Sequence, residues 1–134
     1  MTTAVKLGTQ AIGAAGELLV QYQLVELGID SARLTTDAGI DLVMSVPGQQ
    51  TAATIQVQAN VAPKPAGGKG KLLFSWPFPD DSPAQWMAGV DMSTDSAWLF
   101  PMDHARQLAQ QKHATARGCC TSTPTNPSAQ NPCA

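Results

Sequence analysis

Two short segments with a strand-like alternation of apolar and polar residues constrain this 134-residue chain most strongly. In residues 54–60, apolar side chains at every second position alternate with polar ones, which is the period of a half-buried strand. Residues 39–45 alternate in the same way, and the turn-forming run Val-Pro-Gly-Gln-Gln at residues 46–50 separates the two segments. The pattern therefore predicts a β-hairpin.

One surface of this hairpin is predicted to collect polar side chains. Successive residues of a strand point to opposite faces, so Gln56 and Gln58 share one face of the second segment, and Asp41 lies on the polar face of the first. Upstream, the run Gly-Ala-Ala-Gly-Glu at residues 13–17 opens a helical stretch that carries one acidic residue, Glu17. The small residues of this run would let another element approach the helix closely.

The remaining patterns predict the order of elements in an α/β domain. Helical patterns cover residues 9–27, with Gly28 as the stop, and 102–113, strand patterns cover 32–35, 72–76, 87–92 and 97–100, and residues 80–86 suit a short helix or turn. Such an order predicts a sandwich of helices on a mixed sheet.

The chain is predicted to form a single domain over residues 1–115. Within it, residues 62–71 are rich in Pro, Gly and Lys and are expected to form a loop. Residues 116–134 are dominated by Ser, Thr, Pro and Asn, which predicts a disordered tail. The three cysteines lie in this tail without Cys-x-x-Cys spacing, so neither a disulfide framework nor a zinc site is expected.

The helix glutamate, Gly-Ile-Asp-Leu around Asp41 and Gln-x-Gln at Gln56 and Gln58 follow one another in a familiar order. In this order the chain resembles the PD-(D/E)XK nucleases, especially the small members related to Holliday junction resolvases. The resemblance implies a restriction-endonuclease-like α/β fold, a mixed sheet flanked by helices. It also implies that Glu17, Asp41, Gln56 and Gln58 occupy the catalytic positions, where Gln58 replaces the lysine of the family.

The resemblance further implies Mg²⁺ or Mn²⁺ as the cofactor, with Glu17, Asp41 and Gln56 as its ligands. This set suits Mg²⁺, which takes one or two carboxylates together with waters and phosphate oxygens. Gln58 carries no charge and cannot take up a proton near neutral pH. Because losing one preorganised electrostatic group costs on the order of 10²–10³ in rate, the site is expected to be altered or degraded.

Lysines from the loop at residues 62–71 are candidates to replace the missing charge. Lys64, Lys69 and Lys71 follow the second hairpin strand within reach of it. The glycines around them make this loop adaptable, which argues against a preorganised catalytic lysine. Loss of the charge is therefore preferred over its replacement.

Three functions remain open from the sequence. The first is a metal-dependent DNA endonuclease, and the second is a non-catalytic module of the same fold that binds nucleic acid or a protein partner. In the third, a plain α/β domain, Glu17 shares a solvated helix face with Gln10 and Gln21, and the polar hairpin face is ordinary surface. The oligomeric state is open as well, and the resemblance adds a homodimer to the candidates, because similar resolvases often cut the two strands of a duplex as dimers.

Charge and hydropathy limit which partners, DNA or membrane, the sequence is suited to. The net charge is −2 and 13% of the residues are charged, so the chain lacks the basic excess typical of proteins that bind DNA without other help. The sequence contains no apolar run of the roughly 18 residues that a membrane-spanning helix requires, and its first residues lack a signal-like apolar core. We therefore expect a cytoplasmic protein without a membrane partner.

Overall fold

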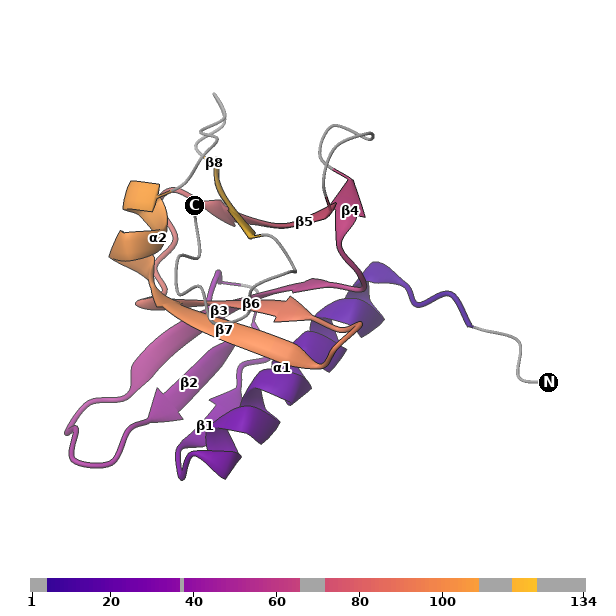
Figure 1. Cartoon of the computed structure of the whole chain (residues 1–134). Coiled ribbons are helices and arrows are strands. Elements are labelled where there is room, and N and C mark those ends of the chain that lie inside the picture. The colour runs from indigo at the N-terminus through magenta and orange to yellow at the C-terminus, as the bar shows by residue number, and fades with distance from the viewer. Residues whose placement is uncertain (1–4, 37, 66–71, 109–116, 123–134) are drawn as a thin grey trace.

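The computed structural model describes residues 5–36, 38–65, 72–108 and 117–122. The elements along the chain are α1 (Thr9–Glu26), β1 (Asp30–Arg33), β2 (Leu42–Ser45), β3 (Ala53–Asn60), β4 (Lys64–Pro65), β5 (Leu72–Pro79), β6 (Trp86–Asp91), β7 (Ser96–Pro101), α2 (Met102–Leu108) and β8 (Arg117–Ser122) (Figure 1).

The main sheet has five strands in the order β1-β2-β3-β6-β7. Strands β3 and β6 are parallel, whereas the pairs β1·β2, β2·β3 and β6·β7 are antiparallel. The sheet is therefore mixed, as predicted. The predicted hairpin is confirmed as β2 and β3, which pair Leu42 with Ile55.

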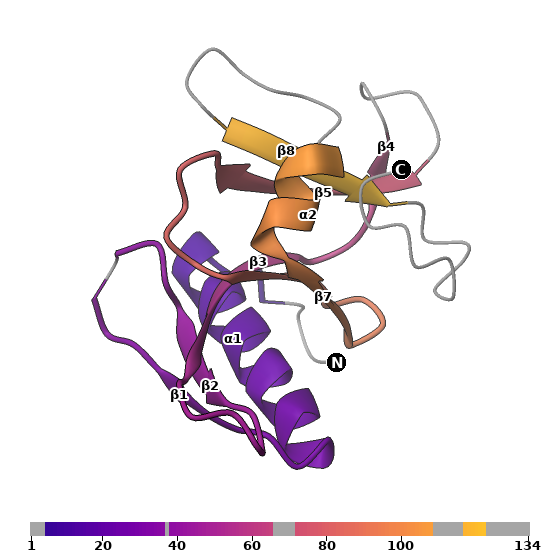
Figure 2. The ribbon, with the colours of Figure 1, turned by 90° about the vertical axis from the view of Figure 1, so that its left-hand side faces the viewer.

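Each face of the sheet carries its own apolar core. Ala88 and Val90 of β6 pack in a cluster with Val20 and Leu24 of α1, whereas Met87 packs in a second cluster with residues of β5, β7 and α2. Because neighbouring residues of a strand point to opposite faces, α1 covers one face, and α2 with β5 covers the other (Figures 1 and 2).

The small residues at the start of α1 have different environments. A Cβ atom added at Gly16 would lie 2.7 Å from Cβ of Ala59 in β3, whereas one added at Gly13 would meet nothing within 4 Å. Close approach between helix and sheet thus occurs at Gly16. The helix ends as predicted, since Gly28 has a φ of 79°, a left-handed conformation that favours glycine, and donates its N–H to the Val25 carbonyl oxygen at 2.9 Å.

The structure differs from the sequence-based expectation in several segments. The first strand, expected at 32–35, spans Asp30–Arg33. Residues 80–86, expected as a short helix or turn, begin as a turn and continue as an extended segment into β6, and β4 lies within the loop predicted at 62–71. Residues 117–122, which were expected in a disordered tail beginning at 116, form β8 and pair with β5 in a small antiparallel sheet that also contains β4.

Two expectations reach beyond the described residues. Helix α2 is described to Leu108, so the last part of the helix predicted over 102–113 lies outside the described residues, as do residues 123–134 of the predicted tail. Within the described ranges, neither helix is long and apolar enough to cross a membrane.

Candidate active site

A surface hollow of about 550 Å³ lies between the first half of α1 and the segment that joins β1 to β2. We call it the Glu17–Asp41 hollow. Its lining residues come from α1, the end of β1 and the position before β2: Gln10, Gly13, Ala14, Glu17, Arg33, Leu34, Thr35, Thr36 and Asp41. The hollow therefore brings together the helix glutamate and the strand aspartate that the sequence singled out.

Glu17 is placed by the packing of its helix and by an ion pair. Its neighbour Gly16 is in close contact with Ala59 of β3, which fixes this turn of α1 against the sheet. The Nε–H group of Arg33 donates to Oε2 of Glu17 at 2.7 Å, and the two side chains are 40% and 18% exposed, respectively. The carboxylate of Glu17 thus stays at the wall of the hollow instead of extending into bulk solvent.

Asp41 is anchored by its backbone and by its side chain at the point where β2 begins. Its N–H donates to the Ile55 carbonyl oxygen at 2.9 Å, and its carbonyl oxygen accepts from the Leu34 N–H at 2.9 Å. Its Oδ2 atom accepts the backbone N–H of Val57 at 2.7 Å. Asp41 therefore bridges β1 and β3, and its carboxylate is oriented by the sheet itself.

The glycine of the Gly-Ile-Asp-Leu run has a conformational role. Gly39 has a φ of 77°, which an L side chain rarely adopts. A Cβ atom at this position would also lie 3.1 Å from Cδ of Pro83. Gly39 thus lets the chain turn into β2 with Asp41 facing the hollow.

Gln56 lies outside the lining of the hollow, on β3. Its pairing partner in β6 is Met87, a member of the cluster on the α2 side of the sheet, and the side chain is only 7% exposed. Oε1 of Gln56 accepts the hydroxyl hydrogen of Ser82 at 2.6 Å. Gln56 is not among the residues that line the hollow, so its role as a metal ligand stays a prediction, one that requires a different side-chain arrangement.

Gln58 shares the face of Gln56, because the two residues lie two positions apart in β3. It is half-buried, is paired with Gly89 of β6, and is also absent from the lining of the hollow. By this alternation the Gln58 side chain is on the face of β3 opposite to Val57, which packs on the α1 side of the sheet. The catalytic role of Gln58 stays a prediction as well.

Sequence reasoning missed Arg33 and the contact made by Ser82. Arg33 lies in a short strand without an apolar pattern, and only the pairing of Arg33 with Leu42 brings it beside Asp41. Ser82 lies in the segment expected as a short helix or turn, and its hydroxyl bonds to Gln56. Of the candidate lysines, Lys64 lies in β4, whereas Lys69 and Lys71 lie outside the described residues.

The donor set of the hollow fits a water-rich Mg²⁺ site better than a cage built by protein. No group of three or more His, Cys, Asp and Glu residues suited to a metal occurs in the described part of the chain. Mg²⁺ keeps several waters and needs only one or two carboxylates, which Glu17 and Asp41 supply. A metal that demands four protein ligands, such as structural zinc, does not fit these residues.

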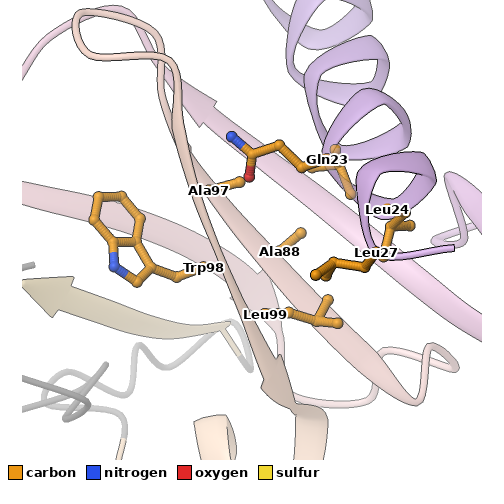
Figure 3. A pocket seen from close by; sticks show the side chains of 8 residues that line it. Gln23, Leu24, Leu27, Ala88, Ala97, Trp98 and Leu99 are labelled. Atoms are coloured by element: carbon orange, nitrogen blue, oxygen red, sulfur yellow. The ribbon is translucent and has the colours of Figure 1, made fainter. Parts of the chain in front are cut away.

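A second pocket, of about 120 Å³, lies between the end of α1 and the strands β6 and β7. Figure 3 shows Leu24 of α1, Leu27 directly after this helix and Leu99 of β7 around a common space, with Trp98 directed away from it. None of the described residues that line this pocket is charged. This pocket therefore offers no groups for phosphodiester chemistry, and the Glu17–Asp41 hollow is the candidate site.

Comparisons with known proteins give the fold. No family model matches the chain, and no curated protein matches it in sequence. A bacterial homing endonuclease is similar in structure with a TM-score of 0.58 and 15% identity, covering 73% of this chain and 68% of the other. Hjc, a Holliday junction resolvase of Archaeoglobus fulgidus, is similar with a TM-score of 0.52 and 13% identity over 84% of each chain. The chain thus has the α/β fold of the PD-(D/E)XK nucleases.

Proposed function

We propose that this protein is a metal-dependent DNA endonuclease with an altered active site, in which Glu17 and Asp41 hold Mg²⁺ or Mn²⁺. The observation that carries the proposal is the meeting of these two carboxylates, one from α1 and one from the start of β2, in a single hollow. The fold adds support, because a homing endonuclease and a Holliday junction resolvase share it.

The residues of the hollow have separable tasks in this proposal. A bound divalent ion supplies Lewis-acid stabilisation of the phosphate and an activated water. Asp41 is held in place by the Val57 N–H, and Glu17 by Arg33, so neither carboxylate has to be ordered when substrate arrives. The hollow is open at the surface, which suits a substrate as large as a DNA backbone.

In this proposal the negative charge of the hollow makes the binding of DNA dependent on a bound divalent ion. Two carboxylates against one guanidinium leave the hollow with a net negative charge, and the whole chain also carries −2. A phosphodiester is therefore repelled until a divalent ion reverses the sign of the hollow. The proposal thus predicts weak binding of DNA in EDTA and stronger binding with a divalent ion present.

The test is nicking of supercoiled plasmid and cleavage of a synthetic four-way junction with Mg²⁺ or Mn²⁺. Glu17→Gln and Asp41→Asn are expected to lower the rate by on the order of 10²-fold or more, because each removes a charged group beside the reacting phosphate. Glu26→Gln, at the exposed end of the same helix, and Asp30→Asn, exposed on β1, are the matched controls and should cleave as the wild type does. Cleavage that survives both hollow substitutions contradicts the proposal.

A second candidate is a non-catalytic module that binds DNA or a protein partner, including a second copy of the chain. The observation that favours it is the burial of Gln56 against Ser82. The lack of charge on Gln58, where the family carries a lysine, also favours it. This candidate predicts that the wild type shifts a labelled junction in Ca²⁺ yet leaves it intact in Mg²⁺ and Mn²⁺. Cleavage by the wild type that is lost in Asp41→Asn excludes it.

A further inference from the structure

We infer that Arg33 is the phosphate-binding cation of the Glu17–Asp41 hollow, and that it gives the site a positive charge which Gln58 does not carry. The inference rests on the proposed function, since it names the residue by which the same hollow contacts the DNA backbone. It assigns a substrate contact to a residue outside the nuclease motif.

The sheet places Arg33 beside both carboxylates. Arg33 is the last residue of β1 and is paired with Leu42, the neighbour of Asp41, and the next residue, Leu34, donates its N–H to the Asp41 carbonyl oxygen at 2.9 Å. Among the described residues that line the hollow, Arg33 is also the one with a cationic side chain. Any phosphate that approaches the two acids in this hollow therefore meets this guanidinium.

The ion pair with Glu17 orients the guanidinium but uses only one of its N–H groups. Glu17 accepts from Nε of Arg33, and among the described residues no hydrogen bond is made by either Nη group. The Arg33 side chain is 40% exposed, so solvent reaches it at the surface of the hollow. A guanidinium held through one edge presents its remaining N–H groups in a planar array, which matches two oxygens of a phosphate.

The contrast with Arg106 supports this assignment. Arg106 donates to the carbonyl oxygens of Asp80 and Ser82 and to the carboxylate of Asp103, so its guanidinium is committed to holding a loop. Arg33 makes a single ion pair at the rim of a hollow. Exposed ion pairs of this kind contribute little to stability, so the fold does not explain why an arginine lies there.

The test measures binding of DNA separately from cleavage. A fluorescein-labelled four-way junction and a short duplex are titrated with the wild type, Arg33→Gln, Arg33→Lys and Lys6→Gln, in EDTA and in Ca²⁺, over a range of salt. Arg33→Gln is expected to weaken binding in Ca²⁺ by about tenfold and to reduce the slope of log K against log salt by about 0.9, as the loss of one phosphate contact requires. Arg33→Lys should keep the slope and lose part of the affinity.

Lys6→Gln removes a charge of the same sign from the exposed segment before α1, outside the lining of the hollow, and should behave as the wild type. Unchanged affinity and slope in Arg33→Gln overturn the inference, and so does an effect confined to Lys6→Gln. Thermal melting of each variant, followed by circular dichroism, shows that the fold is intact before binding is compared.

Cleavage in Mg²⁺ separates this inference from the proposed function. A wild type that does not cleave, combined with a reduced salt slope in Arg33→Gln, refutes catalysis and supports the phosphate contact. A wild type that cleaves, combined with Arg33→Gln that binds and cleaves equally well, refutes the inference alone. A wild type that binds neither the four-way junction nor the duplex in Ca²⁺ overturns both the proposed function and the inference on Arg33.

Discussion

Ser82 donates its hydroxyl hydrogen to Oε1 of Gln56 across 2.6 Å, and both side chains are buried in the contact between β3 and the segment before β6. That segment is held in turn by α2, because Arg106 donates to the Ser82 carbonyl oxygen at 2.6 Å and to that of Asp80 at 2.8 Å. Gln56 therefore has a structural partner within the fold.

The first prediction concerns this bond. Ser82→Ala leaves Oε1 of Gln56 buried without its hydroxyl donor, and we expect the free energy of unfolding to fall by about 1–3 kcal/mol. Urea denaturation followed by tryptophan fluorescence measures the change. Ser45→Ala on the exposed end of β2 is the control, and its urea denaturation curve should coincide with that of the wild type. Coincident curves for Ser82→Ala and the wild type would show that the bond contributes nothing.

The parts of the fold that depend on local pattern were predictable. The period-two alternation gave the hairpin of β2 and β3, and Gly28 marked the end of α1. The proximity of Glu17 and Asp41 was predicted through the family resemblance. Their common hollow additionally depends on how α1 lies over β3, which Gly16 permits and no local pattern specifies.

The contacts that could not be predicted depend on the order of strands in the sheet. Arg33 reaches Glu17 because β1 pairs with β2, and Ser82 reaches Gln56 because the segment before β6 crosses the other face of β3. A short helix or a turn was expected at residues 80–86. Ser82 does accept the N–H of Ala84, but its bond to Gln56 and the bonds from Arg106 hold the segment in a non-helical form.

The second prediction compares the stability effects of substitutions at two glycines in the first half of α1. Gly16→Ala forces a methyl group against Cβ of Ala59, 2.7 Å away, and should destabilise the protein by about 1–3 kcal/mol as overpacked substitutions do. Gly13→Ala meets nothing within 4 Å and should stabilise the helix by roughly 0.5–1 kcal/mol. Thermal melting of the two variants gives the comparison, and shifts of the same sign would contradict the packing of α1 on β3.

The third prediction separates the structural role of Asp41 from its proposed role toward metal. Asp41→Ala leaves the N–H of Val57 without the carboxylate that accepts it at 2.7 Å, at an expected cost of about 1–3 kcal/mol. Asp41→Asn keeps an acceptor oxygen and should recover much of this loss. Amide hydrogen exchange at Val57, measured by NMR, should accelerate in the alanine variant and less so in the asparagine variant. Equal exchange in all three proteins would contradict the bond.

The fourth prediction restores the charge that the family carries. Gln58→Lys adds an ammonium group to β3 on the face away from α1, and the half-buried position accommodates its stem because lysine can extend its charged end toward water. If charge limits the reaction, cleavage in Mg²⁺ should rise by on the order of 10²-fold. Single-turnover kinetics on the four-way junction measure this rate.

Gln58→Met keeps the length of the side chain without charge and is the control for that experiment. Gln58→Lys should also raise the rate of Arg33→Gln, since the new ammonium then provides the charge that the guanidinium no longer supplies at the phosphate. A rate that rises equally in Gln58→Met reports a packing effect instead. No increase in either background would mean that the two faces of β3 do not act on the same phosphate, and that the Glu17–Asp41 hollow works without the lysine position.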